Sequence, residues 1–507
     1  MPKTLADWLS YLESLHPKTI ALGLERVAQV KQRLALRPDF PVISVGGTNG
    51  KGSVCAMLES ILHAAGFRVG CYTSPHLLEY NERVRIGRQN VSDAELCASF
   101  AQIELARCGA GRDSSRRHSV GMNPDLPIQL TYFEFGTLAA MQCFIEHKVD
   151  VAILEVGLGG RLDAVNVFDA DCAVVTSVDI DHTDYLGETR EQIAFEKAGI
   201  FRKGRVAICA DTDVPQALSK HAQEIGAELW RIGGEFGFAS HQGQWDYRSK
   251  AGSRSALPHP ALRGAFQLHN ASAALAALDA LKDRLPVSMA AVRRGLAEVQ
   301  LAGRFQFVPG KPQLILDVAH NPHAARSLAQ NLGNLPPAKT FAVFAMLKDK
   351  DMSGVARALD AQIDVWLVAG IDAVRGASAE ELAQVLRTVP VRGEIVVCTS
   401  IEMALREASN RAGENGGCDS ANGSLRSSGE PVGLPLAATL LRSSRLRDNA
   451  VAVEAHAHNA LGRNQHPPDN PSRTRRLRAP CQECRIAAFG SFYTVAEVMR
   501  VRGLRSA

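Results

Sequence analysis

Apolar residues along the chain gather in short, nearly continuous runs that alternate with amphipathic, helix-like segments. Runs of this kind are typical of parallel strands that helices cover on both faces of a sheet. In the first half of the chain they lie at 41–47, 68–73, 149–155, 172–177 and 205–209. We therefore predict an α/β fold with a parallel sheet, preceded by two helices over 1–36, the first capped by Thr4.

A second series of apolar runs begins near residue 300. Its predicted strands lie at 313–319, 340–346, 364–370, 394–399 and 485–490. The change from one series to the next predicts two domains, with a boundary at 296–303 after a helix over 287–298. We expect a larger N-terminal α/β domain over 1–298 and a smaller Rossmann-like α/β domain over 299–507.

Two polar segments interrupt this pattern. Residues 109–127 are rich in Gly, Ser and Arg, which predicts an exposed loop. Residues 411–480 are rich in Gly, Ser, Asn, Pro and Arg, and we expect a largely disordered insertion there. Its arginine cluster at 473–478 favours a solvated segment over a nucleic-acid contact. The CxxC pair of Cys481 and Cys484 lacks the second pair that a zinc site needs.

Composition narrows the class of protein. Of the 507 residues, 46% are hydrophobic, and the formal net charge of +4 implies no protein-wide basic field for nucleic acid. The eleven cysteines are mostly isolated among apolar neighbours, as reduced thiols are. No apolar run reaches the roughly 18–20 residues that a membrane span requires, and the N-terminus is unlike a secretory signal. We predict a monomeric cytoplasmic enzyme without membrane or nucleic-acid partners.

The clearest chemical motif is the sequence GGTNGKGS over 46–53, which joins a predicted strand to a predicted helix. Glycines let successive backbone N–H groups converge on phosphate oxygens, and the helix N-terminus adds its positive end. Lys51 can reach the β- and γ-phosphates, and Ser53 can hold Mg²⁺, although Gly52 separates the two. The alternative is an ordinary glycine-rich turn. The motif predicts a P-loop domain that binds ATP.

The wording GTNGKGS resembles the Mur-ligase superfamily, and within it the folylpolyglutamate synthase/dihydrofolate synthase family. Matching segments follow in order over nearly the whole chain, except 109–127 and 411–480. They include YTSPHLLEYNERVRI (72–86), LTYFEFGTLAA (130–140), ILEVGLGGRLDAVN (153–166), SVDIDHTDYLG (177–187), EKAGIFR (196–202), LHNASAAL (268–275), LDVAHNPHAA (316–325), MLKDKD (346–351) and GSFYTVAEVM (490–499).

This resemblance implies an ATP-dependent amide ligase that uses Mg²⁺. It would add L-glutamate to 7,8-dihydropteroate, giving dihydrofolate, and to reduced folates, through an acyl phosphate. Three alternatives stay open: a single-activity folylpolyglutamate synthase, a cell-wall Mur-type ligase, and a non-catalytic P-loop binding protein. A cell-wall ligase typically carries a further N-terminal domain, for which the early P-loop leaves little room.

The resemblance also implies the residues of the site. Those expected to contact ATP are Asn49, Gly50, Lys51, Gly52, Ser53, Asn270, Arg304, Asp317 and His320. Those expected around the pteroate are Ala21, Leu22, Gly23, Thr131, Tyr132, Phe133, Glu134, Arg161, Leu162, Asp163 and Ala164. Ala21 stands where the family often carries an acidic residue.

The metal ligands that the resemblance implies are Ser53, Ser74, Glu155 and His182. Glu155 ends a predicted buried strand, where α/β sheets present binding groups, although an ion pair with an arginine is an equal reading. Chemistry alone favours other ligands near His182, because Mg²⁺ prefers hard oxygen. Those candidates are Asp179, Asp181 and Asp184. A purely structural His182 is the alternative.

Three residues are expected to act in catalysis by this resemblance: Lys51, His182 and Lys197. Lys197 looks like the lysine that the family carries as a carbamate, which would replace an ammonium by an anion. Without the family, a surface ion pair between Lys197 and Glu191 or Glu196 on one helix would be the better interpretation.

Overall fold

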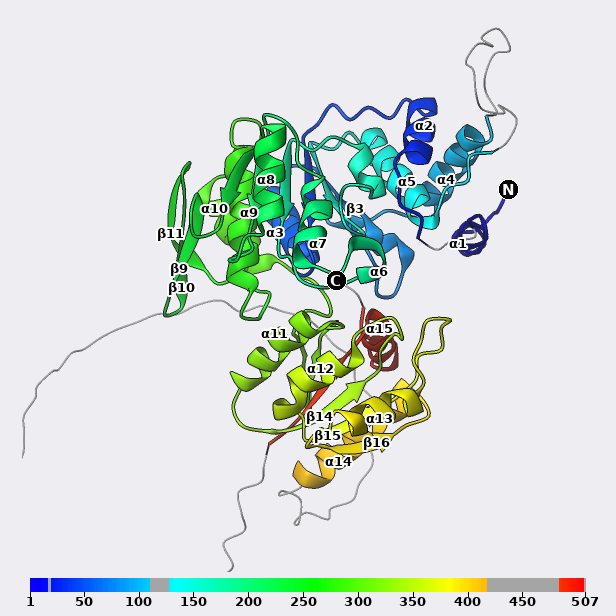
Figure 1. Ribbon diagram of the computed structural model, residues 1–507, viewed down its shortest axis with the longest axis vertical. Coiled ribbons are helices and arrows are strands. Elements are labelled where there is room, and N and C mark those ends of the chain that lie inside the picture. The colour runs from blue at the N-terminus through cyan, green and yellow to red at the C-terminus, as the bar shows by residue number, and fades with distance from the viewer. Residues whose placement is uncertain (17–19, 110–126, 417–482, 506–507) are drawn as a thin grey trace, which may run out of the picture. The chain divides into compact units, whose positions relative to one another are not determined.

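The computed structural model describes residues 1–16, 20–109, 127–416 and 483–505 (Figure 1). The N-terminal half of this part contains an eight-stranded sheet in the order β4-β3-β2-β5-β1-β6-β7-β8. Its strands β2, β5, β1, β6, β7 and β8 run parallel, while β3 and β4 pair antiparallel at one edge. The strands are β1 (Val42–Gly46), β2 (Val69–Tyr72), β3 (Val84–Ile86), β4 (Gln89–Asn90), β5 (Val151–Glu155), β6 (Cys172–Val175), β7 (Val206–Cys209) and β8 (Glu228–Arg231).

Helices follow most of these strands, as the apolar pattern predicts. Thr4 forms a capping box with Asp7 at the start of the first helix, so the predicted cap is confirmed. The helices are α1 (Leu5–Ser14), α2 (Glu25–Arg33), α3 (Lys51–Ala64), α4 (Asp93–Arg107), α5 (Tyr132–Glu146), α6 (Thr183–Leu186), α7 (Arg190–Ala198), α8 (Gln216–Ile225), α9 (Gln267–Ala280) and α10 (Met289–Glu298), with short 3₁₀ turns η1 (Tyr80–Arg83) and η2 (Ala164–Val167).

The central strands β2, β5, β1 and β6 are buried on both faces, to which their successive side chains point in turn. On β1, Val42 belongs to one apolar cluster with α2, α4 and α5, whereas Ile43 and Val45 belong to a second cluster with α3, α9 and α10. On β5, Leu154 and Ile153 divide in the same way. This two-sided burial explains why the strands read as continuous apolar runs.

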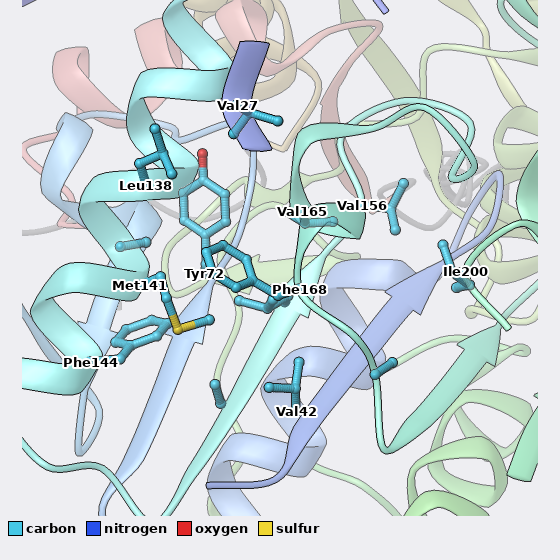
Figure 2. Close-up of a cluster of buried hydrophobic side chains, with 14 of the residues drawn as sticks. Val27, Val42, Tyr72, Leu138, Met141, Phe144, Val156, Val165, Phe168 and Ile200 are labelled. Carbon is cyan, nitrogen blue, oxygen red and sulfur yellow. The ribbon is translucent and has the colours of Figure 1, made fainter. Parts of the chain in front are cut away.

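Aromatic and branched side chains fill the first of these clusters. Figure 2 shows the Tyr72 ring of β2 between Leu138 and Met141 of α5 and Phe168, with Phe144 beside Met141. Each of these five side chains is at most 1% exposed. Burial of side chains of this size contributes about 1.5–3 kcal/mol each, so this layer anchors α5 against the sheet.

A small antiparallel sheet in the order β11-β10-β9 packs beside α9 and is absent from the sequence prediction. Its strands are β9 (Phe236–His241), β10 (Gln244–Ser249) and β11 (Gly252–Pro258). Polar and exposed residues interrupt the apolar positions of all three strands, so they form no continuous apolar run. Trp245 and Tyr247, each at most 1% exposed, attach the sheet to the second cluster.

The C-terminal half contains a six-stranded sheet in the order β12-β13-β17-β14-β15-β16. Strands β13, β17, β14, β15 and β16 run parallel, and β12 pairs antiparallel with β13. They are β12 (Gln306–Val308), β13 (Gln313–Leu316), β14 (Lys339–Phe344), β15 (Val365–Val368), β16 (Glu394–Val397) and β17 (Cys484–Phe489). The helices are α11 (Pro322–Gly333), α12 (Met352–Leu359), α13 (Ala379–Thr388), α14 (Ile401–Gly416) and α15 (Phe492–Val501), with the 3₁₀ turn η3 (Asp360–Gln362).

The α/β fold class with two parallel-sheet units is confirmed. The boundary proposed at 296–303 covers the last residues of α10 and part of the segment before β12, and it stays a prediction. The expected insertion at 411–480 is wrong at its start, because α14 continues to Gly416. Arg411 donates to Glu407 and Glu394, and Ala412 is buried, which extends this helix. The rest of that insertion, and 110–126 of the predicted loop, lie outside the described residues.

A search of the described residues finds no helix that is both long and apolar enough to cross a membrane.

One buried ion pair joins α3 to the edge of the large sheet. The Arg85 guanidinium donates to both carboxylate oxygens of Glu59 at 2.8–3.1 Å, and the side chains are 14% and 7% exposed. Arg85 also donates to the Thr73 hydroxyl at 3.1 Å. The pair therefore ties the helix after the phosphate motif to the loop after β2.

We predict that Arg85→Leu lowers the free energy of unfolding by about 3–5 kcal/mol, because it leaves the Glu59 carboxylate buried without a partner. The double variant Glu59→Leu/Arg85→Leu should recover most of this loss. As a control, Arg294→Leu removes the exposed partner of Glu298 and should cost about 0.5 kcal/mol or less. Urea unfolding followed by circular dichroism measures these differences. A single Arg85 variant as stable as the Arg294 variant would contradict the prediction.

Candidate functional site

A cavity of about 730 Å³ opens at the carboxyl ends of the parallel strands, where α/β sheets bind ligands. The loops after β1, β2, β5 and β6 line it from the N-terminal half. The loops after β13, β14 and β17 line it from the C-terminal half. The cavity therefore collects side chains from both sheets.

The phosphate motif lies at this cavity in a tightly held turn between β1 and α3. Gly47 and Gly50 have φ angles of +141° and +92°. A Cβ atom at Gly47 would collide with the Thr176 hydroxyl, and one at Gly50 would lie 2.6 Å from Asn270 Oδ1. The Thr176 hydroxyl also donates to the carbonyl of Asn49 at 2.6 Å. Only glycine fits either position, so the glycines of the motif are explained by close packing.

Lys51 opens α3, and its ammonium donates to the carbonyls of Gly47 and Thr48 at 3.1 and 3.2 Å. Its charge therefore lies over the loop that the sequence predicts to hold phosphate. Ser53, two residues on, is buried and also lines the cavity.

Glu155 ends β5 and is 5% exposed at the cavity. Burial raises the pKa of this carboxyl group, and the nearby charges of Lys51, Arg304 and Arg85 oppose that rise. It accepts a hydrogen bond from the backbone N–H of Ser74 at 3.1 Å. Within the described ranges no arginine comes within ion-pair distance of Glu155, so the ion-pair reading is not supported.

A cluster of polar and charged side chains lies at the start of α6. Lys350 Nζ is 2.8 Å from Asp181 Oδ1 and 3.1 Å from His182 Nε2, and Asn321 Nδ2 donates to Asp181 Oδ2 at 3.1 Å. Burial alone would raise the pKa of Asp181, but the Lys350 ammonium holds it well below its usual value. Burial lowers the pKa of His182 to about 4, so this imidazole is neutral near pH 7. Lys350 lies in the family segment MLKDKD (346–351), but the sequence alone gives it no role.

The residues expected to hold a metal fit a magnesium site in part. Ser53, Ser74, Glu155 and His182 all line the cavity. Glu155 is a buried carboxylate facing it, and hydroxyl and carboxylate oxygens suit Mg²⁺. His182 Nε2 meets Lys350 instead, so a metal on that nitrogen requires the ammonium to move. In the described residues, no group of three or more His, Cys, Asp or Glu side chains could hold a metal ion without other ligands.

Lys197 lies on α7 with 3% exposure and lines the cavity. Burial and the nearby Lys51 charge lower its pKa to about 7, while Asp181 and Asp163 act in the opposite direction. The surface ion pair considered from the sequence is excluded by this burial. Its two candidate partners, Glu191 and Glu196, form contacts with other groups.

Glu196 pairs with Arg161 at 2.8 Å, and Glu191 accepts from the backbone N–H groups of Gln216 and Ala217 at the start of α8. Both carboxylates are therefore engaged with groups other than Lys197.

The residues expected at the nucleotide converge from both halves. Asn270 is buried beside Gly50 and donates to Gln267 at 3.1 Å. Asn49 Nδ2 donates to Asn321 Oδ1 at 3.2 Å, which links the phosphate loop to the start of α11. Every residue predicted to contact ATP lines the cavity.

Arg304, Asp317 and His320 come from the loops beside β12 and β13. The Arg304 guanidinium lies 5.2 Å from the Phe492 ring centroid, and Asp317 accepts from the backbone N–H of Phe305 at 2.8 Å. His320 Nδ1 lies 2.8 Å from the carbonyl of Val318, and burial lowers its pKa to about 4. These contacts hold a cation and a carboxylate at the wall facing the phosphate loop.

Nine of the residues predicted around the pteroate line the cavity: Ala21, Leu22, Gly23, Thr131, Phe133, Glu134, Leu162, Asp163 and Ala164. Two others, Tyr132 and Arg161, do not. The Tyr132 ring packs edge-on against Tyr80 at 5.7 Å, and the ion pair with Glu196 draws Arg161 away.

Asp163 is the most perturbed acid of this group. Burial raises its pKa to about 7, although the backbone N–H of Leu158 donates to it at 2.8 Å. Gly23 N–H donates to the Leu162 carbonyl at 3.2 Å, so two predicted segments distant in sequence lie side by side.

The chain matches two family models. Residues 45–278 match the Mur ligase middle domain, and residues 303–418 match the Mur ligase glutamate ligase domain. The dihydrofolate synthase/folylpolyglutamate synthase of Escherichia coli K12 is 48% identical over 382 residues, which are 75% of this chain and 85% of that protein.

Solved structures show the same relationship. The E. coli FolC complex with DHPP and ADP has a TM-score of 0.78 and 38% identity, with 99% of each chain covered. A bifunctional folylpolyglutamate synthase/dihydrofolate synthase with Mn, AMPPNP and L-glutamate bound has a TM-score of 0.76 and 39% identity, over 99% of this chain and 98% of that one. The chain belongs to the dihydrofolate synthase/folylpolyglutamate synthase family of Mur ligases.

Proposed function

We propose that this chain catalyses the ATP-dependent addition of L-glutamate to 7,8-dihydropteroate, giving dihydrofolate, and to reduced folylglutamates. One observation carries the proposal: a single cavity joins a lysine-bearing phosphate loop to a buried carboxylate, Glu155, and to cationic loops of the second sheet. The relatives named for both activities support both reactions here.

The chemistry explains the need for this arrangement. A carboxylate and an amine form no amide in water unaided. An oxygen of the acceptor carboxylate attacks the γ-phosphorus of ATP, the bond to ADP breaks, and an acyl phosphate forms. The glutamate amine then attacks the acyl carbon, loses a proton, and displaces inorganic phosphate. Catalysis depends on positioning and on neutralising phosphate charge.

Different parts of the cavity are proposed to bind the phosphates, the rest of the nucleotide and the metal. In the proposal, the loop of Asn49, Gly50, Lys51, Gly52 and Ser53 holds the phosphates, and Lys51 offsets the charge that grows on ADP. Asn270 completes the nucleotide site beside the loop, and Arg304, Asp317 and His320 complete it from the C-terminal half. Ser53, Ser74, Glu155 and His182 would hold Mg²⁺, which supplies positive charge at the phosphate oxygens when bound.

The acceptor is proposed to lie along Ala21–Gly23, Thr131–Glu134 and Leu162–Ala164. Ala21 is the specific observation that favours a second candidate, a single-activity folylpolyglutamate synthase, because the family often carries an acid there. The two candidates differ only in turnover of dihydropteroate.

We also propose a P-loop domain over 1–298 and a ligase domain over 299–507, working as a monomer in the cytoplasm. Residues of one chain line the cavity from both sheets, so the proposed reaction needs no residue from a second copy. The nine cysteines of the described ranges are free thiols, which supports a reducing compartment.

The direct test supplies ATP, Mg²⁺, L-glutamate and one acceptor, and measures ADP and the acceptor's mass. With dihydropteroate and with tetrahydrofolate, each ADP should accompany a mass gain of one glutamyl residue. Turnover of tetrahydrofolate alone would select the single-activity enzyme. ADP release without any mass gain would overturn the ligase assignment.

We predict that Lys51→Ala lowers turnover on the order of 10²–10³-fold, the usual loss on removing a preorganised charge at a reacting centre. The thermal melt should stay nearly unchanged, because Lys51 donates only to the carbonyls of Gly47 and Thr48 in the loop itself. Lys220→Ala, on the exposed pair with Glu224, is the matched control and should keep full activity. A folded Lys51 variant with near-normal rate would contradict the phosphate role.

The carbamate proposal for Lys197 predicts a pH and CO₂ dependence. Only the neutral amine reacts with CO₂, and with a pKa of about 7 its neutral fraction rises between pH 6 and pH 8. Activity at fixed bicarbonate should therefore increase over this range. ¹³C-labelled bicarbonate should give a carbamate signal in wild type that Lys197→Arg lacks, and the variant should lose most activity. If the activity of Lys197→Arg stays within a few-fold of wild type, the carbamate proposal is wrong.

A further inference from the structure

An arginine without a charged partner lies at the cavity wall. Arg83 ends the 3₁₀ turn η1 and is half-buried. Its guanidinium carbon lies 5.3 Å from the Tyr80 ring centroid and 5.5 Å from that of Tyr132, and its Nε donates to His76 Nδ1 at 2.9 Å. These contacts fix the plane of the group and engage only one of its nitrogens.

The two terminal nitrogens of Arg83 remain available. In the portion of the chain that the structure describes, no carboxylate lies within ion-pair distance of Arg83, and neither terminal nitrogen donates to a protein acceptor. Most other half-buried arginines around it are paired, as Arg85 is with Glu59 and Arg26 with Glu134. A guanidinium held in place with its donor fork unused suits a bound carboxylate.

Charges of both signs lie near Arg83, because Glu82 precedes it in the chain and accepts hydrogen bonds from the backbone N–H groups of Leu77, Leu78 and Glu79. Arg500 and Tyr493 of α15 line the same cavity. A ligand anion in this part of the cavity would meet the Arg83 guanidinium, and Arg500 supplies a second cation at the same cavity.

The position of Arg83 lies between the two ends of the proposed site. Its partner His76 follows Ser74, at the proposed metal end, by two residues. Its stacking partner Tyr132 stands between Thr131 and Phe133, which line the cavity at the proposed pteroate end. A carboxylate bound by Arg83 would thus belong to a group located between the pteroate and the reacting carboxylate.

Resting on the proposed function, we propose that Arg83 binds the non-reacting carboxylate of the terminal glutamate in a reduced folate. Dihydropteroate ends in one carboxylate, which reacts. A folate ends in a glutamate with two, of which one reacts and the other needs a counter-charge nearby. Arg83 is therefore a specificity residue for chain lengthening and is dispensable for the first glutamate addition.

The test compares Arg83→Gln with wild type on both acceptors. The KM for tetrahydrofolate should rise roughly 10- to 100-fold, the range for losing a hydrogen bond to a charged group. The KM for dihydropteroate, kcat and the KM for glutamate should stay within about threefold. Arg83→Lys keeps the positive charge but loses the two-pronged donor geometry, so its KM for tetrahydrofolate should lie between those of wild type and Arg83→Gln. Arg88→Gln, at an exposed arginine that donates to the Glu298 carbonyl, is the matched control.

Ligand binding measured without turnover tests the role of Arg83 independently of catalysis. Tetrahydropteroate and tetrahydrofolate differ only by the glutamate. In isothermal calorimetry, Arg83→Gln should weaken the binding of tetrahydrofolate and leave that of tetrahydropteroate unchanged. The thermal melt of the variant should match that of wild type. Equal loss on both ligands, or a raised KM for free glutamate in both reactions, would overturn the inference and assign Arg83 to the pteroate or to the incoming amino acid. If wild type forms neither product, the proposed function fails instead.

Discussion

The close packing of the phosphate loop against its neighbours sets the geometry of everything around it. Gly47 and Gly50 bring the backbone against Thr176 and Asn270 so closely that no Cβ fits at either position. The Thr176 hydroxyl also donates to the carbonyls of Gly46 and Asn49, which holds the loop against the end of β6 and so positions the start of α3 and Lys51. One steric constraint thus places the principal cation relative to the strand ends that carry the acids.

Around this fixed loop the cavity concentrates ionisable groups that burial would otherwise neutralise. Glu155, Lys197 and Asp163 all have pKa values moved toward the neutral form by burial. The Lys51 charge acts on all three groups, Asp163 also acts on Lys197, and Arg304 and Arg85 also act on Glu155, so the charge of a bound phosphate, metal or substrate would change each of them. Asp181 differs, since Lys350 from the second sheet holds it ionised. That pair couples the two halves electrostatically at the wall of the site.

Sequence reasoning located the strands that are buried on both faces, because such strands have an unmistakable apolar run. It missed β9, β10 and β11, whose exposed residues lack that pattern and which depend on Trp245 and Tyr247 for attachment. For the site, local motifs sufficed for the phosphate loop. The pairing of Asp181 with Lys350 and the unpaired state of Arg83 depend on contacts distant in sequence, which spacing alone cannot supply. The ion pair between Arg161 and Glu196 of α7 likewise joins residues distant in sequence, and the role of Arg161 stays a prediction.

The central claim is that one cavity activates a carboxylate by direct transfer of the γ-phosphate. It is tested most directly with dihydropteroate labelled with ¹⁸O in its carboxylate, incubated with ATP, Mg²⁺ and L-glutamate. The account predicts one ¹⁸O in the inorganic phosphate for each ADP, with the other retained in the new amide. Appearance of ¹⁸O in AMP, or phosphate free of label, would contradict it.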